Sequence, residues 1–187
     1  MSGITTRRAF TVDEFLKLDQ IHFFGPEERL ELIDGEIRAM SPINPRHAAI
    51  VGDLVTFFHG QLGKDWLVRG QTPIRLQNDS LPQPDVCILK AKADRYSKAH
   101  PTAKETALVI EVADTSIYTD LGRKKEMYAT AGIPEYWVFD LGENILECFR
   151  NPQDGVYQNH SRLQAKDCAK STALGTEVPL AEFLSPA

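Results

Sequence analysis

Residues 107–116 read ALVIEVADTS and place one carboxylate inside an otherwise apolar run. Four apolar residues precede Glu111, and Val112 and Ala113 follow it. Such a run is typical of a strand that is buried on both faces. A lone ionised carboxylate in a dry core costs several kcal/mol. Glu111 is therefore expected to be neutralised, paired with a cationic side chain or bound to a metal ion.

The residues after Glu111 predict a strand–helix–strand unit. A helix is expected from about Ser116 or Thr119 to Ala131, with Gly132 at its C-terminal end. The next segment, EYWVFD (135–140), reads as a second buried strand. Two strands joined through a helix are expected to be parallel, with a right-handed crossover.

The rest of the chain supplies the elements that surround this unit. They are a helix at 11–19, a hairpin of 29–33 and 36–40 about the turn Asp34-Gly35, a helix capped by Asn44 that starts at Pro45 and ends near Gly63, strands at 66–70, 72–76 and 84–89, and a C-terminal hairpin on either side of NPQDG (151–155). This order predicts an α/β fold on the border of α+β, with a central mixed sheet flanked by helices.

Composition and length narrow the class of protein. A chain of 187 residues favours one domain, over 1–187. The formal net charge of −5 argues against a protein that binds polyanions nonspecifically over its whole surface. No apolar run reaches the roughly 20 residues needed to cross a membrane. The first residues lack an apolar core of signal-peptide length, and three cysteines without a CxxC pair indicate thiols. A cytoplasmic protein is expected, and a zinc site is not expected.

A second acid offers Glu111 a partner. Asp85 begins the apolar run Asp85-Val86-Cys87-Ile88-Leu89. If the strands that carry Asp85 and Glu111 are neighbours, the two carboxylates converge and form an oxygen site of the kind that Mg²⁺ or Mn²⁺ prefers.

A lysine on the expected helix adds a cation to the pair of acids. Lys124 occupies the middle of the inward stripe Leu121, Lys124, Tyr128 and Ala131, where it needs an anion. Two carboxylates, a divalent cation and a lysine together favour hydrolysis of a phosphodiester bond.

These residues resemble a known family. Pro84-Asp85, followed after a gap by Glu111 in an apolar strand, resembles the PD-(D/E)XK nuclease superfamily. More closely, LIDGEIRAMSP, PRH, PDVCIL, VIEV and DLGRKKEMYATAGIPEYWVFD resemble the bacterial restriction endonuclease-like proteins, over a core of about residues 10–180. The resemblance implies a restriction endonuclease-like fold and a Mg²⁺- or Mn²⁺-dependent endonuclease that acts on nucleic acid, in the first place DNA, as a homodimer.

The same resemblance implies roles for individual residues. Asp85, Glu111 and Glu36 would be metal ligands, and Lys124 would position water or stabilise the transition state. The superfamily's lysine two places after the acid is missing, because Ala113 stands there. The closer family instead has the lysine on the next helix, in D-x-x-x-K-x-x-x-Y, which here is Asp120, Lys124 and Tyr128. Asp120, Tyr128 and His47 would support the site.

Each of these residues also has a structural interpretation. Glu111 could form a buried ion pair, Asp85 could be a turn residue after proline, and Lys124 could extend to water. Glu36 could be an exposed hairpin acid, and His47 could pack at a helix start. The basic loop 90–104 could meet a phosphate backbone or be solvated. The alternative function is a non-catalytic nuclease-fold module that binds nucleic acid or a protein partner, and the residues leave both DNA and RNA open.

Overall fold

The computed structural model describes residues 8–184. In chain order its elements are α1 (Val12–Gln20), β1 (Leu30–Ile33), β2 (Glu36–Ala39), α2 (Pro45–Gln61), β3 (Trp66–Gly70), β4 (Val86–Lys90), η1 (Ala103–Glu105), β5 (Thr106–Ala113), α3 (Ile117–Thr119), the π-helix η2 (Asp120–Lys124), α4 (Lys125–Thr130), β6 (Glu135–Asp140), β7 (Ile145–Gln153), β8 (Val156–Gln164), β9 (Cys168–Ser171), β10 (Thr176–Pro179) and η3 (Leu180–Glu182).

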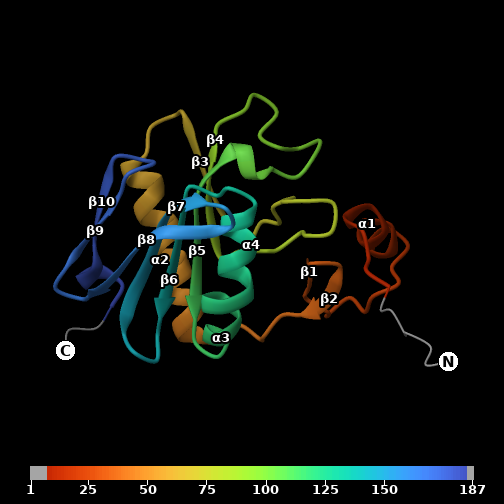
Figure 1. Cartoon of the computed structure of the whole chain (residues 1–187), viewed down its shortest axis with the longest axis horizontal. Helices are drawn as coiled ribbons and strands as arrows, with labels where there is room; N and C mark the ends of the chain where they lie inside the picture. Colours follow the sequence, from red (N-terminus) through yellow and green to blue (C-terminus); the bar gives the residue numbers. More distant parts are fainter. Residues whose placement is uncertain (1–7, 185–187) are drawn as a thin grey trace.

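A six-stranded mixed sheet forms the centre of the fold, in the order β3-β4-β5-β6-β7-β8 (Figure 1). β5 and β6 are parallel, and every other neighbouring pair is antiparallel. The parallel pair is joined by α3, η2 and α4, as the strand–helix–strand pattern predicts. The expected α/β fold with a central mixed sheet flanked by helices is confirmed.

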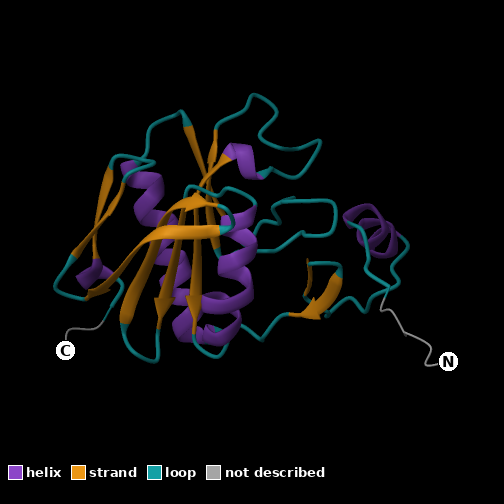
Figure 2. Ribbon diagram, in the orientation of Figure 1, coloured by secondary structure: helices purple, strands orange, loops and turns teal. Residues whose placement is uncertain are grey.

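Helices cover both faces of this sheet (Figure 2). On one face, α2 buries Ile50, Leu54 and Phe58 against the strands. On the other face, α4 buries Met127 and Tyr128. The start of α2 is fixed locally, because the Asn44 side chain accepts the His47 N–H at 2.9 Å and Pro45 takes the first helical position. The sheet therefore has two apolar cores and is buried on both sides.

The N-terminal part forms a separate unit beside the sheet (Figure 1). The strands β1 and β2 form a two-stranded sheet, and Leu32 of β1 also makes an isolated antiparallel bridge with Leu81. The turn residues Asp34 and Gly35 have φ angles of 48° and 75°. Asp and Gly tolerate this left-handed region, so the expected hairpin turn is confirmed. The hairpin and α1 share a small core of Val12, Phe15, Leu32 and Leu81.

The segment 72–76 is not the strand that its sequence predicts. It makes one isolated bridge, Arg75 with Thr102, and its N–H groups bond to scattered carbonyls. Pro73, Pro82 and Pro84 lie in or opposite the segment and have no N–H to donate, so a continuous ladder cannot form.

Three further features differ from the sequence pattern or were not foreseen by it. The expected helix of residues 116–131 contains the π-helix η2, and the hairpin of β9 and β10 follows β8. The basic loop 90–104 leaves β4 at Lys90, at the opposite end of that strand from Asp85. Five residues of strand separate the two by roughly 16 Å, so the loop does not border the proposed acids. In residues 8–184 no helix is long and apolar enough to cross a membrane.

Candidate active site

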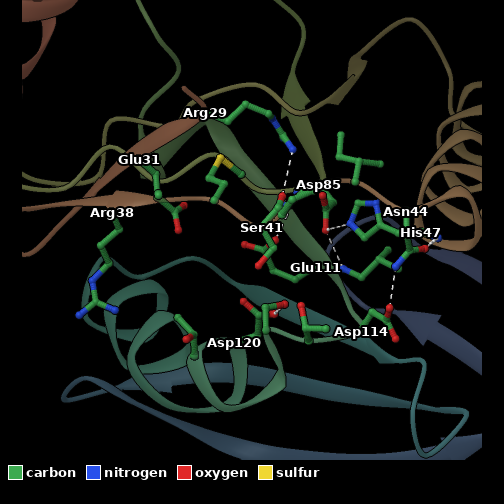
Figure 3. A pocket seen from close by; sticks show the side chains of 18 of the residues that line it. Arg29, Glu31, Arg38, Ser41, Asn44, His47, Asp85, Glu111, Asp114 and Asp120 are labelled. Atoms are coloured by element: carbon green, nitrogen blue, oxygen red, sulfur yellow. Dashed lines mark hydrogen bonds and ion pairs between the residues drawn. The ribbon is translucent and has the colours of Figure 1, made fainter. Parts of the chain in front are cut away.

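A pocket of about 230 Å³ opens where β4 begins and β5 ends (Figure 3). The segment between β2 and α2 forms one wall, and the segment from Asp114 to Lys124 forms another. Its charged or titratable lining residues are Arg29, Glu31, Arg38, His47, Asp85, Glu111, Asp114, Asp120 and Lys124. Most of the residues that the sequence singled out therefore lie around one cavity.

Asp85 and Glu111 meet because β4 and β5 are antiparallel neighbours. Val86 pairs with Ile110, so the preceding Asp85 comes next to Glu111. The Asp85 N–H donates to Glu111 Oε2 at 3.4 Å, and Asp85 Oδ2 accepts the Val112 N–H at 2.9 Å. Both residues are buried, at 7% and 4% exposure. Two carboxylates are thus held at the end of two strands, in a setting of low dielectric.

Lys124 reaches this pair from η2. Its Nζ lies 3.1 Å from Glu111 Oε1, 3.3 Å from Glu31 Oε2 and 3.8 Å from Asp120 Oδ1. Burial lowers the pKa of Lys124, but the charges of these three carboxylates raise it above its ordinary value. The amine is therefore protonated at neutral pH and acts as a hydrogen-bond donor and a cation.

The carboxylates outnumber the buried cations. Glu31, Asp85, Glu111 and Asp120 are buried, with Lys124 as the one buried ammonium in residues 8–184. Burial raises the pKa of Glu111 well above its usual range, and the charges of Asp120, Asp85 and Glu31 add to the effect while Lys124 opposes it. Burial also raises the pKa of Asp120. A further proton or cation is therefore electrostatically favoured here.

The three predicted supporting residues also lie at the cluster. His47 Nε2 is 3.0 Å from Asp85 Oδ2, and its Nδ1 is buried without a hydrogen-bond partner in the described part of the chain. The Tyr128 hydroxyl donates to Glu111 Oε1 at 3.1 Å. Asp120 Oδ2 accepts the Ser116 hydroxyl at 2.5 Å. Each of the three contacts an acid or Lys124.

Glu36 does not lie where the resemblance implies. Its Oε2 accepts from Arg38 Nη2 and Arg123 Nη1, both at 2.9 Å, and it is outside the pocket lining. Both arginines lower the pKa of Glu36. The reason is register, because Ile33 pairs with Glu36 while Glu31 pairs with Arg38, two residues further from the turn.

Glu31, which was not among the predicted site residues, takes the place expected of Glu36. Its Oε2 also accepts the Gln83 N–H at 3.2 Å, which fixes the carboxylate beside Lys124. A signal was present, because Glu31 interrupts the apolar run Leu30-Glu31-Leu32-Ile33 in the same way as Glu111 interrupts its strand.

The donor set suits a metal ion that keeps much of its water. In residues 8–184 no group of three or more His, Cys, Asp or Glu side chains is arranged to hold a metal ion. Asp85 Oδ1, however, accepts no hydrogen bond from these residues, while Oδ2 accepts from Val112. Mg²⁺ typically takes one or two carboxylates and fills its remaining positions with water and substrate phosphate. Asp85 and Glu111 fit that mode of binding.

Comparisons with known proteins find a nuclease-like family and a solved structure of similar fold. The model of the Uma2 family, described as "Putative restriction endonuclease", matches residues 12–181. A solved structure of a "putative nuclease belonging to DUF820" from Anabaena variabilis ATCC 29413 is similar, with a TM-score of 0.73 and 17% sequence identity. The similarity covers 94% of this chain and 98% of that one. No curated protein matches the chain.

Proposed function

Because the chain belongs to the Uma2 family, we propose that it is a Mg²⁺- or Mn²⁺-dependent endonuclease that hydrolyses phosphodiester bonds in DNA. Family and fold together support a nuclease. The observation that carries the proposal is the convergence of Asp85 and Glu111 at the ends of adjacent strands, with Lys124 bonded to Glu111. Burying these charges costs free energy and does not help to pack an apolar core, which favours a functional role for them.

Asp85 and Glu111 would hold the metal ion. When bound, the ion polarises a phosphoryl oxygen and lowers the pKa of a bound water. Its positive charge also offsets the excess of buried carboxylates, which explains how the fold tolerates them. Glu36 as a metal ligand has no support in this arrangement, because two arginines bind its carboxylate.

Lys124 would act as a donor. Its protonated amine lies against Glu111, and from there it can orient the attacking water or stabilise charge that develops on the phosphate. Tyr128 and Asp120 would position Glu111 and Lys124, and His47 would position Asp85.

Calorimetric titration with Mn²⁺ tests the metal site, and plasmid cleavage tests the activity. The wild type should bind Mn²⁺ and nick or linearise the plasmid, whereas Asp85→Asn should do neither. Asp154→Asn, in the β7–β8 turn, is the control and should match the wild type. A folded protein that binds nucleic acid but neither binds Mn²⁺ nor cleaves DNA would instead be the non-catalytic nuclease-fold module.

The remaining details of the proposal have their own tests. Matched DNA and RNA substrates decide the class of nucleic acid, and we propose DNA from the family description. A homodimer would allow cleavage of both strands, and the mass in solution checks it. Cytoplasmic localisation follows from the cysteine pattern and stays a prediction, as does the single domain over residues 1–187.

A further inference from the structure

Three of the four basic side chains that line the pocket have acidic partners. Lys124 is surrounded by carboxylates, His47 contacts Asp85, and Arg38 binds Glu36. The fourth, Arg29, has no carboxylate within ion-pair distance among residues 8–184. Its one side-chain hydrogen bond there is long, from Nη1 to the Ser41 carbonyl at 3.5 Å. Arg29 therefore brings a positive charge to the pocket that no acidic side chain among the described residues pairs.

The hairpin fixes where this charge lies. The Arg29 carbonyl accepts the Met40 N–H at 2.8 Å, which extends the pairing of β1 and β2 by one step. Alternate residues of a strand share a face, so Arg29 lies on the same face as Glu31. Figure 3 shows the Arg29 guanidinium directed toward Ser41 inside the pocket, while that of Arg38 points away from Asp85.

Glu31, the acid that shares this face with Arg29, already has other partners. Glu31 Oε2 pairs with Lys124 at 3.3 Å and accepts the Gln83 N–H at 3.2 Å. Arg29 is half-buried, so its position is defined while its guanidinium can still reach an incoming group. An unpaired guanidinium beside a cluster of carboxylates suits an anion that enters from outside.

We propose that Arg29 binds a phosphate of the substrate strand at the mouth of the pocket. This inference rests on the proposed function and adds the residue that receives the strand. A guanidinium presents two parallel N–H donors to a phosphate, which an ammonium cannot do. The contact offsets the repulsion between the strand and the buried carboxylates, so Arg29 is a positioning residue for binding. The competing interpretation is a solvated arginine that only lowers the negative field of the pocket.

The test measures salt-dependent binding of a duplex DNA oligonucleotide. Arg29→Gln and Arg29→Lys are compared in an Asp85→Asn background, so that binding is measured without cleavage. Each lost phosphate contact makes the slope of log K against log salt less negative by about 0.9. Arg29→Gln should show this change. Arg29→Lys should keep the slope and bind more weakly, because it keeps the charge and loses the paired donors.

Two control variants distinguish a direct contact between Arg29 and phosphate from a general electrostatic effect of positive charge in the pocket. Arg162→Gln removes an arginine from β8, at the far edge of the sheet, and should leave the slope unchanged. Arg38→Gln removes the same charge from the same pocket. If it changes the slope as much as Arg29→Gln does, a general field explains the data and the proposal fails. The proposal also fails if Arg29→Gln has the same salt slope as the Asp85→Asn protein in which it is made, or if that Asp85→Asn protein binds no DNA.

Kinetics distinguish this inference from the proposed function. In the otherwise wild-type protein, Arg29→Gln should raise KM about tenfold, keep kcat within about threefold and bind Mn²⁺ normally. Normal Mn²⁺ binding and cleavage with unchanged KM would overturn the role of Arg29 alone. A wild type that neither binds Mn²⁺ nor cleaves DNA would overturn the proposed function, and the oligonucleotide slope would still decide whether Arg29 contacts phosphate.

Discussion

Glu111 and Glu135 lie on adjacent parallel strands, and both are buried, at 4% and 1% exposure. Glu135 Oε1 accepts the N–H and hydroxyl of Thr172 at 2.6 Å and the Ala173 N–H at 2.8 Å. Arg150 Nε lies 3.9 Å from its other oxygen. Glu111 accepts from Lys124 and Tyr128 on one oxygen and from the Asp85 N–H, at 3.4 Å, on the other, and further acids surround it.

The difference shows how a fold can bury a carboxylate in two ways. Neutral donors satisfy one oxygen of Glu135, and the other oxygen has no hydrogen-bond partner in residues 8–184 but lies 3.9 Å from the Arg150 guanidinium. These contacts tie the segment before β10 to the sheet. The cluster around Glu111 has more negative than positive charge, so it gains from a cation that the chain does not contain. A buried acid among donors is structural, and a buried acid among acids is a candidate for function.

The largest expected effect is on cleavage. Glu111→Gln, Asp85→Asn and Lys124→Met should each lower the rate of plasmid cleavage with Mn²⁺ by at least about 100-fold, because each removes a metal ligand or the donor. Glu135→Gln is the matched control and should cleave within about threefold of the wild type. Undiminished cleavage by folded Glu111→Gln would remove the distinction between the two acids.

The second effect concerns stability, for which substitution of Glu135 is expected to cost more than substitution of Glu111. Glu135→Ala leaves the donors of Thr172 and Ala173 without their acceptor, so its free energy of unfolding should fall by about 3 kcal/mol. Urea denaturation at neutral pH measures the change. Glu111→Gln should cost clearly less in EDTA, because it removes one charge from an acidic cluster. Equal losses would mean that both acids are structural.

The third effect comes from adding metal. Mn²⁺ at about 100 times its dissociation constant should stabilise the wild type by about 2.7 kcal/mol. Thermal denaturation with and without Mn²⁺ checks this. Glu135→Gln should keep the increase in melting temperature, and Asp85→Asn should lose it. An increase that survives in Asp85→Asn would place the ion elsewhere.

A smaller effect depends on pH and is measured in EDTA. The folded-state pKa of Glu111 lies well above the ordinary glutamate value of 4.5, chiefly because of burial. The unfolded chain therefore loses this proton first, and the Glu111 contribution destabilises the fold as pH rises from 4.5 toward the folded pKa. The stability of Glu111→Gln relative to wild type should rise over that range and then level off. A difference that is constant with pH would contradict the raised pKa.

The smallest effect tests the hairpin. Arg123 joins η2 to the hairpin through Asp34 at 2.7 Å and Glu36 at 2.9 Å. These groups are partly exposed, so Arg123→Gln should cost less than about 1 kcal/mol in urea denaturation. Because the hairpin carries Glu31 to Lys124, the variant should also make cleavage more sensitive to salt. A loss as large as that of Glu135→Ala would contradict the surface character of these pairs.

Local patterns were enough to predict most of the fold. The Asn44 cap, the Asp34-Gly35 turn and the apolar runs at 84–89, 107–113 and 135–140 each depend on neighbouring residues, and the structure has these elements in place. The prediction of a strand at 72–76 was wrong, because Pro73 lies within the segment and Pro82 and Pro84 lie opposite it, so only an isolated bridge forms.

The site was predictable only in part. Asp85, Glu111 and Lys124 stand out because each puts a charge where its element is apolar, and the structure brings them together. Glu31 carries the same signal, but the sequence does not show whether Glu31 or Glu36 faces Lys124, because register and the position of Arg123 decide this. The π-helix that carries Lys124 and Asp120 also has no signature in the residue pattern.

The sequence by itself determined which segments form helices and strands and which of them carry buried acids, since periodicity and capping act over a few residues. Only the tertiary structure decided which charges pair. It brings Glu31 from the hairpin, Asp85 from the position just before β4 and Lys124 from η2 to one pocket, and it leaves Arg29 without an acidic partner among residues 8–184. Ion pairing depends on distances of a few ångströms between residues far apart in the chain, and only the packed fold sets those distances.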